Sequence, residues 1–160
     1  MGIPTLAQRR KLVGIGNYQF GNGVGQILFG KSVRIECSRK TGRIRHVFVN
    51  DQLIATLRPK DGYLALTTHG ASIILSRAKN PPNIVSVETD VSEAIQAGGD
   101  VFAKHVVRAD PELRPADEAI VTDQRGALLG VGRAVLSGVE MMDFKRGVAV
   151  KLRRGVEADT

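Results

Sequence analysis

The sequence predicts an α+β fold organised as two small units, the first of them containing an antiparallel meander. Segments in which apolar and polar residues alternate recur between residues 33 and 66 and between residues 119 and 152, as is typical of half-buried strands. Asn80-Pro-Pro-Asn83 interrupts this pattern, because proline breaks helices and removes donors from a sheet. Charge divides at the same place: residues 1–82 hold thirteen Lys and Arg against three Asp and Glu, whereas residues 83–160 hold ten against thirteen. We therefore expect one unit at 1–82, a second at 83–156 and a tail at 157–160.

An amphipathic helix is expected to begin near Thr5. Basic and polar residues separate four apolar ones with a spacing that fits one helical face moderately well: Leu6, Leu12, Val13 and Ile15. Gly14 and Gly16 are expected to end this helix, since glycine commonly terminates helices.

The segment Gly25–Ser32 satisfies the literal P-loop pattern, a glycine, any four residues and then Gly-Lys-Ser. A working P-loop follows a buried strand and precedes a helix whose N-terminus binds phosphate. Here the upstream residues are polar and rich in glycine, Ile27-Leu-Phe29 resembles a short core-facing helix, and an alternating strand pattern begins at Val33. A small nucleotide-binding enzyme therefore stays as a weak alternative. ATP binding that is lost in Lys31→Ala would support it.

From Val33 onward the first unit is predicted to be a meander. Strands are expected at residues 33–38, 43–49, 52–57, 63–66 and 71–75, joined by short turns rich in Gly, Asn, Asp and Pro. In the first strand Val33, Ile35 and Cys37 are expected to face the core, because alternate residues of a strand lie on the same face.

The densest basic cluster of the chain lies at the first turn of this meander. It contains Arg39, Lys40, Arg43 and Arg45. Arg43 and Arg45 are two residues apart, so a regular strand would project both from one face. Several positive charges on one rigid face could follow a phosphate backbone, each contact releasing counterions. The alternative is a solvated sheet face with no ligand.

The second unit is predicted to begin with a strand at residues 84–88 and a helix at residues 92–97. Asp90 and Glu93 have the spacing of a capping box, and Gly98-Gly99 would stop the helix. Four residues that follow are expected in the core: Val101, Phe102, Val106 and Val107.

The rest of this unit is predicted to be a loop at residues 110–116, a hairpin and a final strand. Residues 119–122 are expected to pair with residues 127–136. Met141, Met142 and Phe144 would plug one end of the unit. In the last strand Val148, Val150 and Leu152 would face inward, and Lys151 and Arg153 outward. Asp117 and Glu118 are adjacent, so they would point to opposite faces of a strand, which favours structural or surface roles over joint catalysis.

Composition excludes several classes of protein. Cys37 is the single cysteine, so the chain can form no internal disulfide and no cysteine cluster for zinc. No stretch approaches the roughly 18 apolar residues of a membrane span, and the N-terminus lacks a signal-like apolar region. We expect a cytoplasmic protein that needs no metal or cofactor and does not contact a membrane.

Two sets of motifs resemble a known family. The stretch Gly99–Asp123, followed by Gly130-Val-Gly132 and Gly147–Gly155, resembles a PUA domain, a small pseudo-β-barrel that many RNA-modifying enzymes carry as an RNA-binding module. The specific form resembles the one at the C-terminus of archaeal archaeosine-type tRNA-guanine transglycosylases. The first unit resembles the small α+β domain ahead of that PUA module, in the runs Tyr18-Gln-Phe-Gly21, Leu28-Phe29, Arg39–Arg45, Ile54–Pro59 and Asp61-Gly62. The resemblance spans about residues 8–155.

The resemblance implies an RNA partner. Family members contact RNA at positions that correspond here to Gly98, Gly99, Lys104, His105, Lys151 and Arg153. The second unit is net acidic, so the first would supply most of the phosphate attraction. Only 4% of residues are aromatic, which argues against reading single-stranded bases by stacking and favours a folded, duplex-containing RNA such as tRNA.

No residues here correspond to the family's catalytic barrel, its nucleophilic Asp or its zinc ligands. The sequence therefore predicts a non-catalytic RNA-binding protein that binds tRNA, by its shape and phosphates, in connection with tRNA modification by a separate enzyme. The alternative within the family is a translation-associated PUA factor that acts on initiator tRNA or the ribosome.

Overall fold

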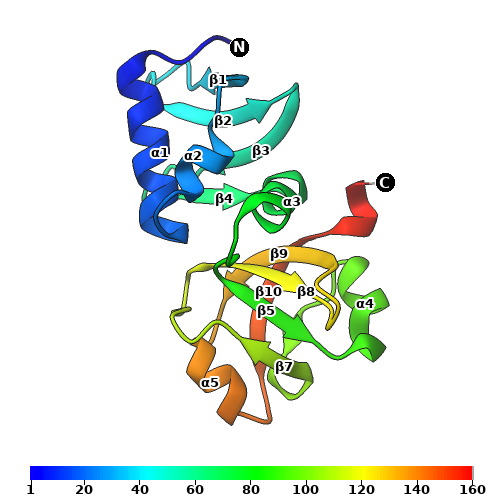
Figure 1. The fold of residues 1–160 in the computed structure, drawn as a ribbon. Coiled ribbons are helices and arrows are strands. Elements are labelled where there is room, and N and C mark those ends of the chain that lie inside the picture. The colour runs from blue at the N-terminus through cyan, green and yellow to red at the C-terminus, as the bar shows by residue number, and fades with distance from the viewer. Residues whose placement is uncertain (160) are drawn as a thin grey trace. The chain divides into compact units, whose positions relative to one another are not determined.

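The computed structural model describes residues 1–159 and divides into two compact units, one ending at Asn80 and the other beginning at Pro81 (Figure 1). The mixed α+β class predicted from the sequence is confirmed. Within residues 1–159, no helix is long and apolar enough to span a membrane.

Two helices open the first unit and pack together (Figure 1). Helix α1, Leu6–Phe20, begins at a capping box in which Thr5 Oγ1 accepts from the Gln8 amide and the Gln8 side chain accepts from the Thr5 amide. Helix α2, Val24–Leu28, follows after a glycine-rich turn. The prediction that Gly14 and Gly16 end α1 is wrong: the helix runs through both. Gly16 lies at the contact with α2, where a Cβ would come within 2.8 Å of Gly25 Cα, so its small size serves helix packing.

The meander is present with four strands: β1 (Val33–Cys37), β2 (Ile44–Val49), β3 (Gln52–Leu57) and β4 (Leu64–Leu66), adjacent in that order and antiparallel. As predicted, Val33 and Ile35 are buried and Cys37 is half-buried. The fifth strand predicted at residues 71–75 is wrong.

That segment instead belongs to helix α3, Thr68–Arg77. Thr67 caps it by accepting a hydrogen bond from the Gly70 amide at 3.1 Å. Ala71 and Ile74 are fully buried and three residues apart, which is the spacing of one helical face. The local cap and this spacing outweigh the β-branched residues that suggested a strand.

The second unit contains a six-stranded, nearly closed sheet in the order β6-β10-β9-β8-β5-β7. All pairings are antiparallel except that of β5 with β8. The strands are β5 (Ile84–Val87), β6 (Val101–Phe102), β7 (Val106–Ala109), β8 (Glu118–Thr122), β9 (Leu128–Ala134) and β10 (Val148–Gly155). Helices α4 (Ser92–Gln96) and α5 (Gly138–Asp143) accompany them, with 3₁₀ turns at Thr89–Val91, Ala103–His105 and Val156–Asp159.

The cap predicted for α4 is wrong. The N-cap of α4 is Val91, which makes no side-chain cap, and the 3₁₀ turn Thr89–Val91 runs directly into the helix. A capping box occurs instead at α5. There the Ser137 amide donates to Glu140 Oε1 at 2.9 Å, and the Glu140 amide donates to Ser137 Oγ at 3.1 Å.

The core of the second unit agrees with the predictions only in part. Val101, Met141 and Val150 are buried, as predicted. Phe102, Val107, Met142 and Phe144 are exposed, by 39 to 51%. Phe102 lies in β6 and Val107 lies in β7, and these are the two edge strands of the sheet. The short helix α5, which carries Met142, buries only Gly138 and Met141. Val106, Val148 and Leu152 are half-buried.

Candidate nucleic-acid interface

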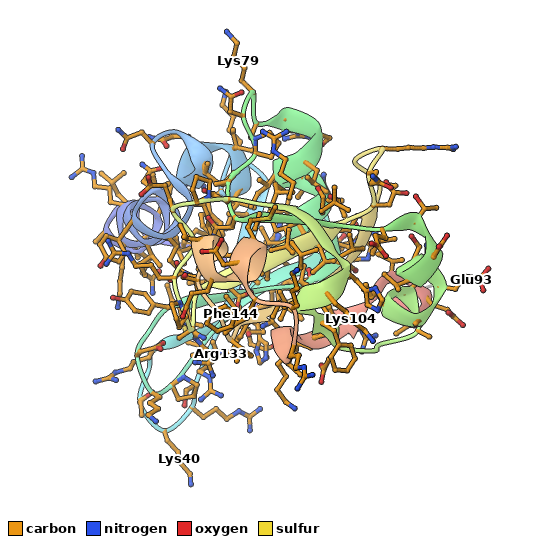
Figure 2. The ribbon with its side chains drawn as sticks, turned by 90° about the horizontal axis from the view of Figure 1, so that it is seen from below. Lys40, Lys79, Glu93, Lys104, Arg133 and Phe144 are labelled. Atoms are coloured by element: carbon orange, nitrogen blue, oxygen red, sulfur yellow. The ribbon has the colours of Figure 1, made fainter. Side chains whose placement is uncertain are left out.

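The basic turn, residues 39–45, comprises most of the loop between β1 and β2 and the first two residues of β2 in the first unit. It is closed by backbone hydrogen bonds of 2.8 Å, from the Ser38 amide to the Arg43 carbonyl and from the Gly42 amide to the Ser38 carbonyl. Gly42 has φ +70°, a conformation that glycine adopts without strain. Arg39, Lys40 and Arg43 are exposed, and Figure 2 shows Lys40 pointing away from the end of its loop.

A β-bulge places Arg45 differently from a regular strand. Cys37 pairs with Ile44 and Glu36 pairs with His46, which leaves Arg45 as the extra residue. Ile44 and Val47 are accordingly both buried although they are three residues apart. Arg43 precedes β2, and Arg45 is half-buried. The rule of two-residue alternation, on which the shared face of Arg43 and Arg45 was predicted, therefore does not apply at this point of the strand.

The cations of the basic turn are not neutralised by neighbouring carboxylates. In the described part of the chain, none of the four has an acidic side chain within salt-bridge distance. Glu36 lies 3.1 Å from His46 Nδ1, and Asp61 lies 3.3 Å from Arg58 Nε. The turn thus presents three exposed positive side chains to solvent.

In the second unit, four of the predicted RNA-binding residues lie near α4 and the 3₁₀ turn that follows β6. Gly98, with φ +108°, and Gly99 are exposed just after α4. Lys104 is exposed, and Figure 2 shows its side chain on this unit. His105 is partly buried, with Nδ1 3.3 Å from Glu88 Oε2.

Lys151 lies on a different part of the second unit, in β10. It is exposed and is paired in register with Arg133 of β9, which is also exposed. Both residues line a hollow of about 520 Å³, together with Pro115, Ala116, Ala134, Val135, Leu152 and Arg153. Arg133 was not among the residues predicted to bind RNA, and its one signal in the sequence is its position as a cation in an otherwise apolar strand.

Arg153 is held by an ion pair. Its Nη1 and Nη2 donate to Oε1 and Oε2 of Glu118 at 3.0 and 2.6 Å, and the Glu118 side chain is fully buried. Two parallel hydrogen bonds of this kind fix the guanidinium group and neutralise its charge. This arrangement gives Glu118 a structural role and leaves Arg153 less charge for a phosphate than Lys151 has. The buried acid could have been suspected from the sequence, because Glu118 opens the apolar run Ala119-Ile-Val121.

The P-loop-like segment does not have P-loop geometry. Gly25 lies inside α2, where a Cβ would collide with the backbone of Val13, and Leu28 and Phe29 are buried. Lys31 and Ser32 occupy an exposed turn that leads into β1 rather than into a helix. No helix N-terminus is therefore available at these residues for phosphate. Among the side chains that the structure describes, those of residues 1–158, no three of His, Cys, Asp or Glu form a group that could hold a metal ion.

Family models match both units. Residues 10–81 match the patch-forming domain C2 of tRNA-guanine transglycosylase, and residues 83–156 match the PUA domain. The chain thus combines a C2-type domain with a PUA domain. This PUA-domain protein is 38% identical, over 148 residues, to tRNA-guanine(15) transglycosylase of Methanobrevibacter smithii. The alignment covers 92% of this chain and 22% of that enzyme, in its C-terminal region. The chain thus spans about a fifth of the length of this relative.

Two solved structures share the fold of the PUA-domain protein. A hypothetical protein of Pyrococcus horikoshii has a TM-score of 0.77 at 21% identity, with 95% of this chain and 92% of that chain covered. A conserved PUA domain protein of Thermoplasma acidophilum has a TM-score of 0.68 at 22% identity, with 96% and 91% covered. Both likenesses extend over the two units.

Proposed function

We propose that this PUA-domain protein binds tRNA without catalysing a reaction on it, in connection with tRNA modification by a separate enzyme. The proposal is supported by the two matched domains, one of them described by its place in tRNA-guanine transglycosylase. The similarity to a tRNA-modifying enzyme at 38% identity points to the same class of RNA.

The observation that carries the proposal is the unneutralised charge of the first unit. Residues 1–82 contain thirteen basic and three acidic residues, and the basic turn presents Arg39, Lys40 and Arg43 to solvent. A phosphate backbone is the polyanion that such a surface attracts, because each contact releases condensed counterions. The first unit then supplies most of the attraction. Gly98, Gly99, Lys104, His105, Lys151 and, to a lesser degree, Arg153 of the second unit orient the RNA.

A tRNA transcript titrated at several salt concentrations tests this proposal. The affinity of the native chain is expected to fall steeply with salt. The double variant Lys40→Glu/Arg43→Glu is expected to bind more weakly. Its slope of log K against log salt is expected to be smaller in magnitude by about 0.9 for each duplex phosphate that it no longer neutralises. The matched control is Arg77→Glu/Lys79→Glu, which changes the charge equally at exposed residues outside the basic turn; Figure 2 shows Lys79 projecting into solvent. Lys104→Ala is expected to have a smaller effect than the double variant of the turn.

Equal weakening of binding in the two charge-reversed variants would contradict a specific role of the basic turn, and absence of tRNA binding would contradict the proposed function. The non-catalytic part is tested separately. After incubation of tRNA with the protein alone, mass spectrometry of its nucleosides is expected to show no change. Sequencing of RNA that copurifies from the native cell is expected to show tRNA, whereas enrichment of ribosomal RNA would favour the translation-associated alternative.

A further inference from the structure

Both tyrosines of the chain lie together on the surface of the first unit. Tyr18, near the end of α1, stacks on Tyr63, which immediately precedes β4, with ring centroids 5.8 Å apart and planes inclined by 14°. Tyr18 is 77% exposed and Tyr63 is 37% exposed. Packing within the first unit does not account for the exposure of these two rings. The side of the Tyr18 ring that faces away from Tyr63 has no aromatic partner among the residues described.

The backbone beneath both rings is held rigidly. Next to Tyr18, the Gln19 side chain accepts from the Leu64 amide at 2.7 Å and donates to the Leu64 carbonyl at 3.1 Å, which ties α1 to β4 (Figure 1). The Tyr63 amide donates to Asp61 Oδ1 at 2.9 Å, and the Tyr63 carbonyl accepts from the Arg58 amide at 2.8 Å. Because these bonds fix both attachment points, little ordering is required when a ligand binds to the rings.

Positive charge adjoins the pair on two sides. Lys11 lies seven residues before Tyr18, so the two share a face of α1 about 10 Å apart along the helix axis. Gly14 lies between them on that face, and it is exposed with open space where a Cβ would be. On the side of Tyr63, the exposed Lys60 belongs to the turn that leads into β4, in which Arg58 is paired with Asp61. The pair is thus an aromatic surface flanked by cations.

Resting on the proposed function, we propose that the Tyr18–Tyr63 pair is a stacking platform for one unpaired base of the bound RNA. A planar ring joined to phosphates matches both features of the site, since the aromatic face binds the base and the flanking lysines bind the adjacent phosphates. The low aromatic content of the chain argues against extended stacking along a single strand, but it does not oppose one base at one preformed site. An unpaired nucleotide of an otherwise folded RNA fits these conditions.

Substitution of Tyr18 gives the first test. Tyr18→Ala is expected to weaken binding of a tRNA transcript between about fivefold and a hundredfold, the range for removal of one base–aromatic stack. The slope of log K against log salt is expected to stay unchanged, because stacking releases no counterions. Tyr18→Phe keeps the ring and is expected to bind like the native chain. Leu6→Ala, which removes another exposed apolar side chain of α1, is the matched control and is expected to have no effect.

Intrinsic fluorescence gives the second test. The chain has no tryptophan and two tyrosines, so its emission reports on this pair alone. A single-stranded oligoadenylate RNA is expected to quench the emission on binding, whereas an abasic oligonucleotide of equal length, which carries the charges without the rings, is expected to bind without quenching.

The two failures are distinguishable. Suppose that the native chain binds the tRNA transcript. If Tyr18→Ala then binds it equally well, or if oligoadenylate binds without quenching the emission, the platform is overturned and the proposed function stands. If the native chain binds neither RNA, the proposed function itself is overturned.

Discussion

The ion pair between Glu118 and Arg153 ties β8 to β10 across the intervening strand β9. Glu118 is fully buried, so removal of Arg153 would take from this interior charge the cation that compensates it. We expect Arg153→Met to lower the free energy of unfolding by about 3 kcal/mol, measured by urea denaturation. The double variant Glu118→Met/Arg153→Met is expected to recover most of this stability.

Arg133→Met serves as the control for that experiment. Arg133, which is labelled in Figure 2, is an exposed cation of β9 that is paired in register with Lys151. Its replacement is expected to change stability by less than about 0.5 kcal/mol. If Arg153→Met proves equally harmless, the ion pair does not stabilise the fold and Arg153 is available for RNA.

Tyr63 carries a second prediction at the scale of single residues. A hydrogen bond to Tyr18, together with the neighbouring Tyr18 charge at high pH, raises the pKa of Tyr63 above its ordinary value, because both favour the neutral phenol. Tyr18→Phe removes these causes, so the pKa of Tyr63 is expected to fall. Spectroscopic titration of tyrosinate checks this, since Tyr63 is the only tyrosine left in the variant. An unchanged midpoint would show that the two hydroxyls are not coupled.

At the scale of elements, the two glycines inside α1 are expected to respond oppositely to the same substitution. Gly14 is exposed and a Cβ there would meet nothing within 4 Å, so Gly14→Ala is expected to raise the free energy of unfolding by about 0.5–1 kcal/mol. Gly16 faces the Gly25 backbone of α2, where neither chain can move away easily, so Gly16→Ala is expected to lower it. Thermal unfolding followed by circular dichroism measures both. Stabilisation by Gly16→Ala would mean that the helices do not approach so closely.

These glycines also show why some elements could not be predicted from the sequence. From sequence alone, a glycine predicts the end of a helix unless a second helix is known to pack against it. The residue that Gly16 packs against, Gly25, is nine residues further along the chain. Residues 71–75 have the composition of a strand, but the cap at Thr67 and the burial of Ala71 and Ile74 make a helix. Asp90 and Glu93 have the spacing of a capping box, yet the 3₁₀ turn Thr89–Val91 takes its place. In each case packing or local geometry outweighs propensity.

At the scale of the whole molecule, features that depend on residues close together in the sequence could be predicted. Contacts between residues far apart in the sequence could not. The strand alternation from Val33 to Leu66, the basic turn and the Pro-Pro break all depend on neighbouring residues, and so did the PUA resemblance. The Glu118–Arg153 pair joins residues 35 apart, and the Gln19–Leu64 bonds that support the tyrosine platform join residues 45 apart. The alternation of apolar and polar residues predicts which face of a strand a residue lies on, but not which distant residue it contacts there.

The division of charge yields the last prediction. We propose that residues 1–82 and residues 83–160 are independently folding domains, because each unit has its own sheet and buried residues, and Pro81-Pro82 lies between the two. Each fragment is expected to unfold cooperatively when expressed alone. The basic fragment 1–82 is expected to retain most of the salt dependence of tRNA binding, whereas the acidic fragment 83–160 is expected to bind weakly with a shallow slope, since its acidic residues outnumber its basic ones. Titration of both fragments and the intact chain with one tRNA transcript measures this. If the slope of the intact chain instead belongs to fragment 83–160, the attraction comes from Lys104, Lys151 and their neighbours, and the basic turn has another role.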